Sequence, residues 1–182
     1  MHWSDVMANR LAERGNKHII ATGITPSGEF HIGHLREILT GDMIARAARK
    51  AGMEAELVFV VDNADPLRKV YPFLDEAYEA FIGHQLGSIP APDSEGKPDW
   101  ARFNEEGWTY ADHFLQPFLD ALRQIGVVPK LLPNLAAYRS GKFAEAARTA
   151  CDRADEVREI IERVSGRDLP EGWFPWQPLD SN

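Results

Sequence analysis

The most constraining feature of this sequence is an apolar run that ends in a tight turn and leads directly into a helical pattern. Residues 19–24 form the run, which has the length of a strand, and Thr-Pro-Ser-Gly at 25–28 ends it. From residue 31 to about 51, apolar residues recur on one helical face until Gly52 ends the pattern. A strand, a turn and a helix in this order predict the first unit of an open parallel sheet.

The pattern then repeats with different lengths. Residues 55–61 (AELVFVV) are continuously apolar, which is typical of a parallel strand covered on both faces. We expect a helix over 75–86, an exposed proline-rich loop over 88–100, a helix over 108–125 and a third strand over 127–132. This order predicts an α/β fold, the β-α-β-α-β half of a doubly wound parallel sheet, with additional helices over 135–139 and 143–164.

Composition excludes several classes of protein. Of the 182 residues 44% are hydrophobic, enough for a core, yet no apolar stretch approaches the roughly 20 residues that cross a bilayer. The first residues lack the basic and apolar regions of a secretory signal, so we expect a soluble, cytoplasmic protein without membrane association. Cys151 is the single cysteine, and no Cys/His cluster has zinc-ligand spacing, so no metal site is predicted.

The net charge of −8 disfavours extensive contact with nucleic acid, because such contact neutralises phosphates with a clustered basic surface. We therefore expect little RNA binding from these residues alone. The local patch of Arg46, Arg49 and Lys50 has two interpretations: a contact with RNA, or a solvated helix face.

The segment with chemical potential is TPSGEFHIGH, residues 25–34, since it lies where open parallel sheets bind ligands. A helix amino terminus exposes unpaired N–H groups and attracts phosphate. Gly28 and Gly33 remove side chains where a nucleotide must approach closely. His31 and His34 are three residues apart, on one helical face, and both can donate hydrogen bonds to phosphate oxygens.

His31 and His34 are therefore the candidate catalytic residues. Such donors stabilise the charge that builds up on phosphorus during in-line attack, and each is typically worth ~3 to 4 kcal/mol. The alternative is structural: His31 as a helix cap and His34 as a surface residue.

The motif resembles the signature of class I aminoacyl-tRNA synthetases, and its longer PSGxxHIG form resembles their lysyl branch. The similarity extends over nearly the whole chain. It includes His2-Trp3, GITPSG at 23–28, Arg36-Glu37, the acidic cluster Asp62 and Asp65 followed by Arg68-Lys69-Val70, Tyr138 with Gly141, and Pro170 with Trp173. One departure is His34, where the lysyl branch usually has asparagine.

The resemblance implies a Rossmann-like fold and assigns roles by position. Gly23 and Thr25 would line a lysine pocket. The ATP-binding residues would be Pro26, Ser27, Gly28, His31, Gly33 and His34. Asp62 and Asp65 would attract the lysine ammonium or the ribose, although carboxylates at strand ends more often cap turns.

The implied function is that of a lysine-tRNA ligase, which activates lysine with Mg-dependent ATP and transfers it to tRNA-Lys. The chain would be one partial catalytic domain, 1–182, with a nucleotide-binding half over 16–132 and a helical extension over 133–182. That extension would lead toward an insertion and a second half bearing a KMSKS-type loop, so we expect negligible catalysis by this segment alone. The alternatives are an HxGH nucleotidyltransferase and a non-catalytic synthetase paralog that binds RNA or protein.

Overall fold

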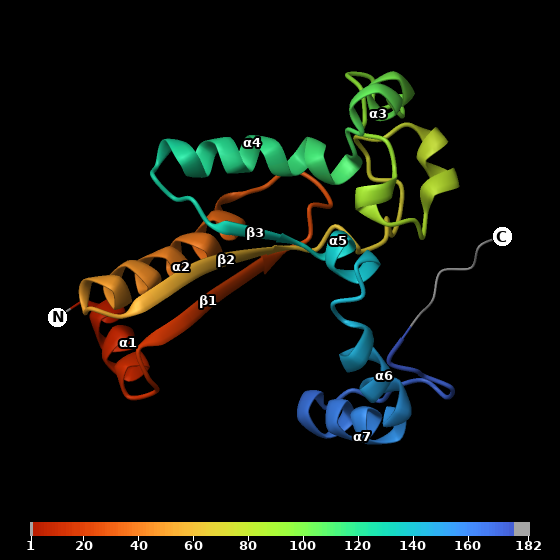
Figure 1. The fold of residues 1–182 in the computed structure, drawn as a ribbon. Helices are drawn as coiled ribbons and strands as arrows, with labels where there is room; N and C mark the ends of the chain where they lie inside the picture. The colour runs from red at the N-terminus through yellow and green to blue at the C-terminus, as the bar shows by residue number, and fades with distance from the viewer. Residues whose placement is uncertain (1, 177–182) are drawn as a thin grey trace. The chain divides into compact units, whose positions relative to one another are not determined.

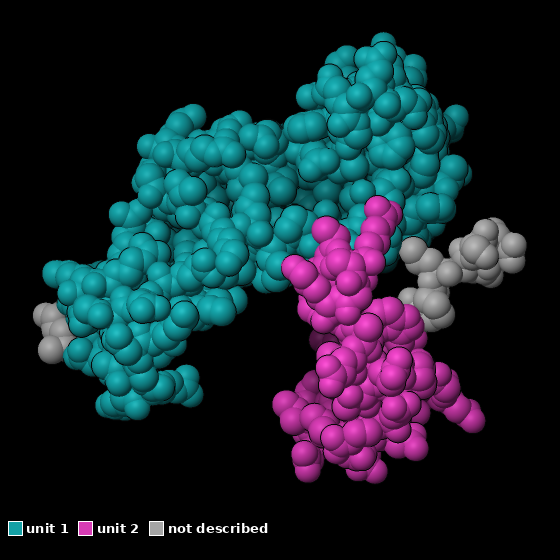
Figure 2. Space-filling model, in the orientation of Figure 1, with its two compact units in different colours: residues 1–135 teal, residues 136–182 magenta. Residues whose placement is uncertain are grey.

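The protein has two compact units, Met1–Leu135 and Ala136–Asn182 (Figure 2). A computed structural model describes residues 2–176. The first unit contains a three-stranded parallel sheet (Figure 1). Its strands are β1 (Lys17–Ile24), β2 (Glu54–Val61) and β3 (Lys130–Pro133), in the order β1-β2-β3. The predicted α/β fold with a parallel sheet is confirmed, whereas the division 16–132 and 133–182 stays a prediction.

Helices pack on one face of this sheet. In a cluster of buried side chains, Phe59 of β2 meets Ile38 of α2 (Ile32–Lys50) and Phe118 of α4 (Tyr110–Gln124). The first helix, α1 (Trp3–Ala12), packs against α2. This layer holds α2, whose amino end follows β1, firmly against the strands.

The coverage on both faces that the sequence predicts for residues 55–61 does not extend to β1 within residues 2–176. Exposed and more buried residues alternate along β1, and Ile19 is 69% exposed. The side chains of successive residues in a strand point to opposite faces of the sheet. One face of β1 is therefore buried under α2, and the other is open.

A glycine allows α2 to approach the sheet closely. A Cβ atom on Gly41 would lie 2.8 Å from Cγ2 of Thr22 and 3.0 Å from Cδ1 of Leu57, too near for either contact. Because residue 41 has no side chain, the backbone of α2 lies directly on β1 and β2.

The segment between β2 and β3 departs most from the sequence prediction. The helix expected over 75–86 is instead two 3-10 segments, Glu76–Phe81 and Leu86–Ser88. The proline-rich loop ends in a helix that the prediction missed, α3 (Trp100–Glu106), capped by the Asp99 carboxylate, which accepts from the N–H of Arg102. The strand expected over 127–132 begins only at Lys130.

The second unit is helical. It contains most of α5 (Asn134–Arg139), together with α6 (Ala144–Asp152) and α7 (Ala154–Ser165). The single helix expected over 143–164 is divided at Arg153, whose backbone leaves the helical region (φ −118°, ψ 35°). Neither α6 nor α7 contains a buried residue.

Arg46 forms an ion pair within α2 and also joins this helix to the turn that precedes β3. Asp42 as a whole residue is only 7% exposed, and its carboxylate lies 2.5 Å from Nε of Arg46. The same guanidinium donates to the carbonyl of Gly126 at 2.6 Å. We expect Arg46→Met to lower the free energy of unfolding by about 1 to 3 kcal/mol, because it leaves a buried carboxylate without its partner.

Urea denaturation measures this loss. In the double variant Asp42→Asn with Arg46→Met the charge is gone, so part of the stability should return. Equal stability of Arg46→Met and the unsubstituted chain would show that the pair contributes nothing.

Candidate functional site

The carboxyl ends of the three strands meet at one edge of the sheet, and hydrogen bonds join the residues that follow them. The Thr25 hydroxyl, one residue past β1, donates to Asp65 beyond β2 at 2.8 Å. Asn134, directly after β3, donates its side-chain amide to Asp62. The structure thus brings together three predicted residues, Thr25, Asp62 and Asp65, and adds Asn134.

Charge at this edge is partly buried. Burial raises the pKa of the Asp62 carboxyl, the negative charge of Asp65 raises it further, and the amide of Asn134 opposes both. A partly buried carboxylate with a second carboxylate nearby favours a positively charged group between or beside them. This is the chemistry that a ligand ammonium would meet.

The turn after β1 is tied to α4. Pro26 is buried, and the carbonyl of Ser27 accepts a hydrogen bond from the Tyr110 hydroxyl at 2.8 Å. Burial raises the pKa of Tyr110, so its hydroxyl remains a donor. Gly28 has ordinary room for a Cβ atom, 3.7 Å from the Phe73 ring, so no neighbour among the described residues requires a glycine there.

The amino end of α2 is closed by a reciprocal cap. Nδ1 of His31 accepts from the N–H of Gly33 at 3.0 Å, and Nδ1 of His34 accepts from the N–H of His31 at 3.1 Å. The two rings stack with their centroids 3.9 Å apart. The capping interpretation of His31 is therefore correct for this conformation, and His34 is a cap as well.

Capping does not remove the donors. A neutral imidazole whose Nδ1 accepts a hydrogen bond carries its proton on Nε2, so His31 and His34 each keep one N–H for a ligand. Burial lowers the pKa of His34, His31 lowers it further, and Glu37 opposes them. The neutral, Nε2-protonated form of His34 is thus favoured at pH 7.

Gly33 is required by this arrangement. A Cβ atom at residue 33 would lie 2.7 Å from Cε1 and 2.9 Å from Nδ1 of the His31 ring. The ring fills the space that a side chain would take. The sequence assigned Gly33 to close approach by a nucleotide; the structure adds close approach by His31.

A contact across the helix start was missed by the sequence prediction. Glu37, three residues after His34, accepts the N–H of Gly23 near the end of β1 at 3.1 Å. No local pattern marks this bond, since 14 residues separate the partners. Asn134 could have been found, because residues that follow parallel strands meet at one edge.

Cavities flank the motif on two sides. One of about 410 Å³ lies between β1 and α2, and Gly33, Arg36 and Glu37 line part of it. Another, of about 340 Å³, is lined by Phe30 and by aromatic residues of α4. Both volumes fall within the range of small-molecule pockets or close to it.

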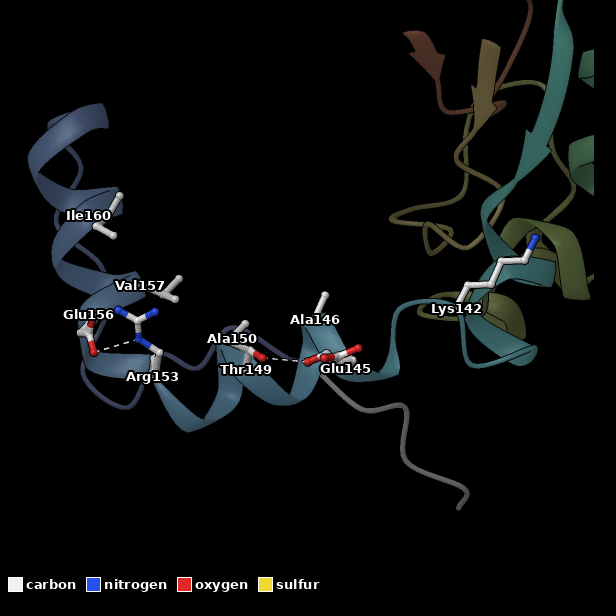
Figure 3. A pocket seen from close by; sticks show the side chains of 9 residues that line it. All are labelled: Lys142, Glu145, Ala146, Thr149, Ala150, Arg153, Glu156, Val157 and Ile160. Carbon is white, nitrogen blue, oxygen red and sulfur yellow. Dashed lines mark hydrogen bonds and ion pairs between the residues drawn. The ribbon is translucent and has the colours of Figure 1, made fainter. Parts of the chain in front are cut away.

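A third cavity, of about 580 Å³, belongs entirely to the second unit (Figure 3). It lies along α6 and α7, with the ion pair of Arg153 and Glu156 at the bend between them. None of the residues predicted for catalysis or binding lines it.

The basic trio has mainly structural contacts. Arg46 binds Asp42 and Gly126, and Arg49 donates to the carbonyl of Ala55 at 2.9 Å.

Within residues 2–176 no three side chains of His, Cys, Asp or Glu gather where a metal ion could sit. In the same residues no helix combines the length and the apolar character of a membrane span.

Comparison with known proteins identifies relatives along the whole sequence. The family described as tRNA synthetases class I (K) matches residues 1–182. Lysine--tRNA ligase 1 of Methanosarcina acetivorans is 43% identical over 98% of this chain and 31% of its own length. The Lysine--tRNA ligase of Archaeoglobus fulgidus is 45% identical over 100% of this chain and 35% of its own length. The Lysine--tRNA ligase of Methanosarcina barkeri is 42% identical over 98% of this chain and 31% of its own length. The chain spans about a third of the length of these relatives.

The hydroxyl of Tyr110 offers a test of how the turn is held. We expect Tyr110→Phe to lower the free energy of unfolding by about 1 to 2 kcal/mol, because the carbonyl of Ser27 loses its donor. Urea denaturation provides the measurement, and Tyr71→Phe, at a residue packed beside the same aromatic cluster, is the control. Equal losses in the two variants would show that the bond to Ser27 has no specific role.

Proposed function

Because the chain belongs to the family of class I (K) tRNA synthetases, we propose that it supplies the first half of the site at which a lysine-tRNA ligase forms lysyl-adenylate. The observation that carries the proposal is the reciprocal cap of His31 and His34 at the start of α2, directly beyond β1. The relatives are about three times as long as this chain, so the complete reaction is proposed for a protein that includes the remainder.

The proposed reaction joins lysine to ATP. The lysine carboxylate attacks the α-phosphorus, a new P–O bond forms, and the bond to the β-phosphate oxygen breaks with release of pyrophosphate. Negative charge on the phosphate oxygens must be stabilised as this occurs. The Nε2–H groups of His31 and His34 are donors of the required kind, and the partial positive charge at the amino end of α2 favours the same phosphate.

Preorganisation is what the cap contributes. Each imidazole is held by a hydrogen bond at Nδ1, so its tautomer is set before a phosphate arrives. Donors that need no rearrangement during the reaction stabilise the transition state most effectively. Pro26, Ser27 and Gly28 shape the turn that leads to this helix start, in keeping with an ATP-binding role.

Lysine would bind at the neighbouring strand ends. Gly23 and Thr25 are the proposed pocket residues, and Thr25 is held by Asp65. The carboxylates of Asp62 and Asp65 favour a cation, which suits an ammonium group of lysine better than an uncharged side chain. Adenylate formation thus requires the strand ends and the start of α2 to act together.

We also infer the metal ion, the acceptor and the cellular location of the reaction. ATP enters such sites as its magnesium complex, tRNA-Lys accepts the lysyl group, and the cytoplasm is where charged tRNA is used. The acidic composition supports tRNA contacts made mainly by the remainder of the intact enzyme. Of the alternative functions, an HxGH nucleotidyltransferase has no support from the family match. A non-catalytic paralog differs from a synthetase in that it would not bind the lysyl-adenylate analogue.

Calorimetric titration of the chain with a sulfamoyl analogue of lysyl-adenylate tests the proposal. We expect weak binding that His34→Ala reduces roughly tenfold, through loss of one donor to a charged group. His34→Asn keeps an acceptor and a donor, so its loss should be smaller. His84→Ala, the same change away from the motif, should bind as the unsubstituted chain does.

Three outcomes would contradict the proposal or one of its assignments. Absence of binding to the unsubstituted chain would favour the non-catalytic paralog. Equal affinity for an analogue that carries leucine in place of lysine would remove the assignment of lysine, and equal affinity of His34→Ala would remove the role of the histidine.

A further inference from the structure

Glu37 contacts the end of β1 and stands beside a histidine of the motif. Its Oε1 accepts the N–H of Gly23 at 3.1 Å. It follows His34 by three residues on α2, so the two side chains are neighbours on one face of the helix. Glu37 is thus a residue of α2 whose side chain connects the proposed lysine-binding strand end to the proposed phosphate-binding helix start.

The bond occupies a particular edge of the sheet. In a parallel strand the N–H groups of alternate residues point to opposite edges, and β1 is the terminal strand of the sheet within residues 2–176. The carbonyl of Ile24 accepts from Asp62 on the β2 side, so the N–H of Gly23 belongs to the outer edge. Glu37 takes the position that a further strand would need in order to pair with Gly23.

This contact has a structural consequence for a ligand. An outer-edge N–H without a partner invites pairing with another strand. With Glu37 in place, this N–H already has an acceptor within residues 2–176. The same bond fixes the peptide plane of Gly23 relative to α2, two residues before Thr25.

We propose that Glu37 is a positioning residue of the lysine site, which fixes the end of β1 against the helix that carries His31 and His34. This inference rests on the proposed function, because it assumes that Gly23 and Thr25 bind lysine. Glu37 acts through Gly23 and is not a catalytic residue in this account. Its carboxylate also raises the pKa of His34, against the effects of burial and of His31, which lower it.

Two substitutions separate the hydrogen bond from the charge. Glu37→Gln keeps an acceptor for Gly23 and loses the charge, whereas Glu37→Ala loses both. Glu79→Gln, the same change on the 3-10 segment Glu76–Phe81, is the matched control. Glu37 is exposed, so neither variant at this position should prevent folding.

Amide hydrogen exchange reports on the bond without any ligand. We expect the Gly23 amide to exchange roughly tenfold faster in Glu37→Ala, with little change in Glu37→Gln or in the control. Titration of the His34 ring by NMR reports on the charge. Its pKa should fall further below the ordinary value in both Glu37 variants, since the carboxylate that raises it is gone.

Calorimetry with the lysyl-adenylate analogue then tests the positioning role. Affinity should fall roughly fivefold in Glu37→Ala and be largely restored in Glu37→Gln. If the unsubstituted chain binds the analogue and Glu37→Ala binds equally well, or if Gly23 exchange is unchanged in Glu37→Ala, the positioning role is overturned. If the unsubstituted chain does not bind, the lysine site itself is overturned, whatever the exchange rates show.

Discussion

The interaction on which the rest of the site depends is the reciprocal cap at the start of α2. Four unpaired N–H groups open any α-helix, and here two histidine rings take part in satisfying them. Because each ring accepts through Nδ1, the proton of its neutral form is placed on Nε2. One local arrangement therefore ends the turn, begins the helix and prepares two donors for an anion.

The position of this cap is set by the sheet. Gly41 brings α2 onto β1 and β2, and Phe59, Ile38 and Phe118 fill the layer between the sheet and its helices. The turn before the cap is held from α4 by Tyr110. The cap therefore has a fixed position relative to the strand ends, where Thr25 and Asp65 lie.

Much of this could be predicted from the sequence, since the signals were local. The apolar runs predicted β1 and β2, and helical periodicity after the turn predicted α2 with its amino end close to His31. Motif spacing placed His31 and His34 on one face. The strand ends predicted the positions of Asp62 and Asp65, and hydrogen bonds now show their partners.

The rest depends on contacts between distant residues. The bond of Glu37 to Gly23 and that of Tyr110 to Ser27 have no sequence periodicity. The helix α3 was missed because prolines before it indicated a loop, although Asp99 supplied a capping signal. The prediction began β3 too early because Val127 is apolar, as a strand residue would be. In the structure Val127 is buried after the turn at Gly126, before the strand begins.

The central claim is that phosphate binds at the capped start of α2. NMR titration of the isotope-labelled chain with a non-hydrolysable ATP analogue tests it most directly. The largest shifts should fall on the backbone amides of Ile32, Gly33 and His34 and on the Nε2–H groups of both histidines. Shifts confined to α6 and α7, with those amides unchanged, would contradict it.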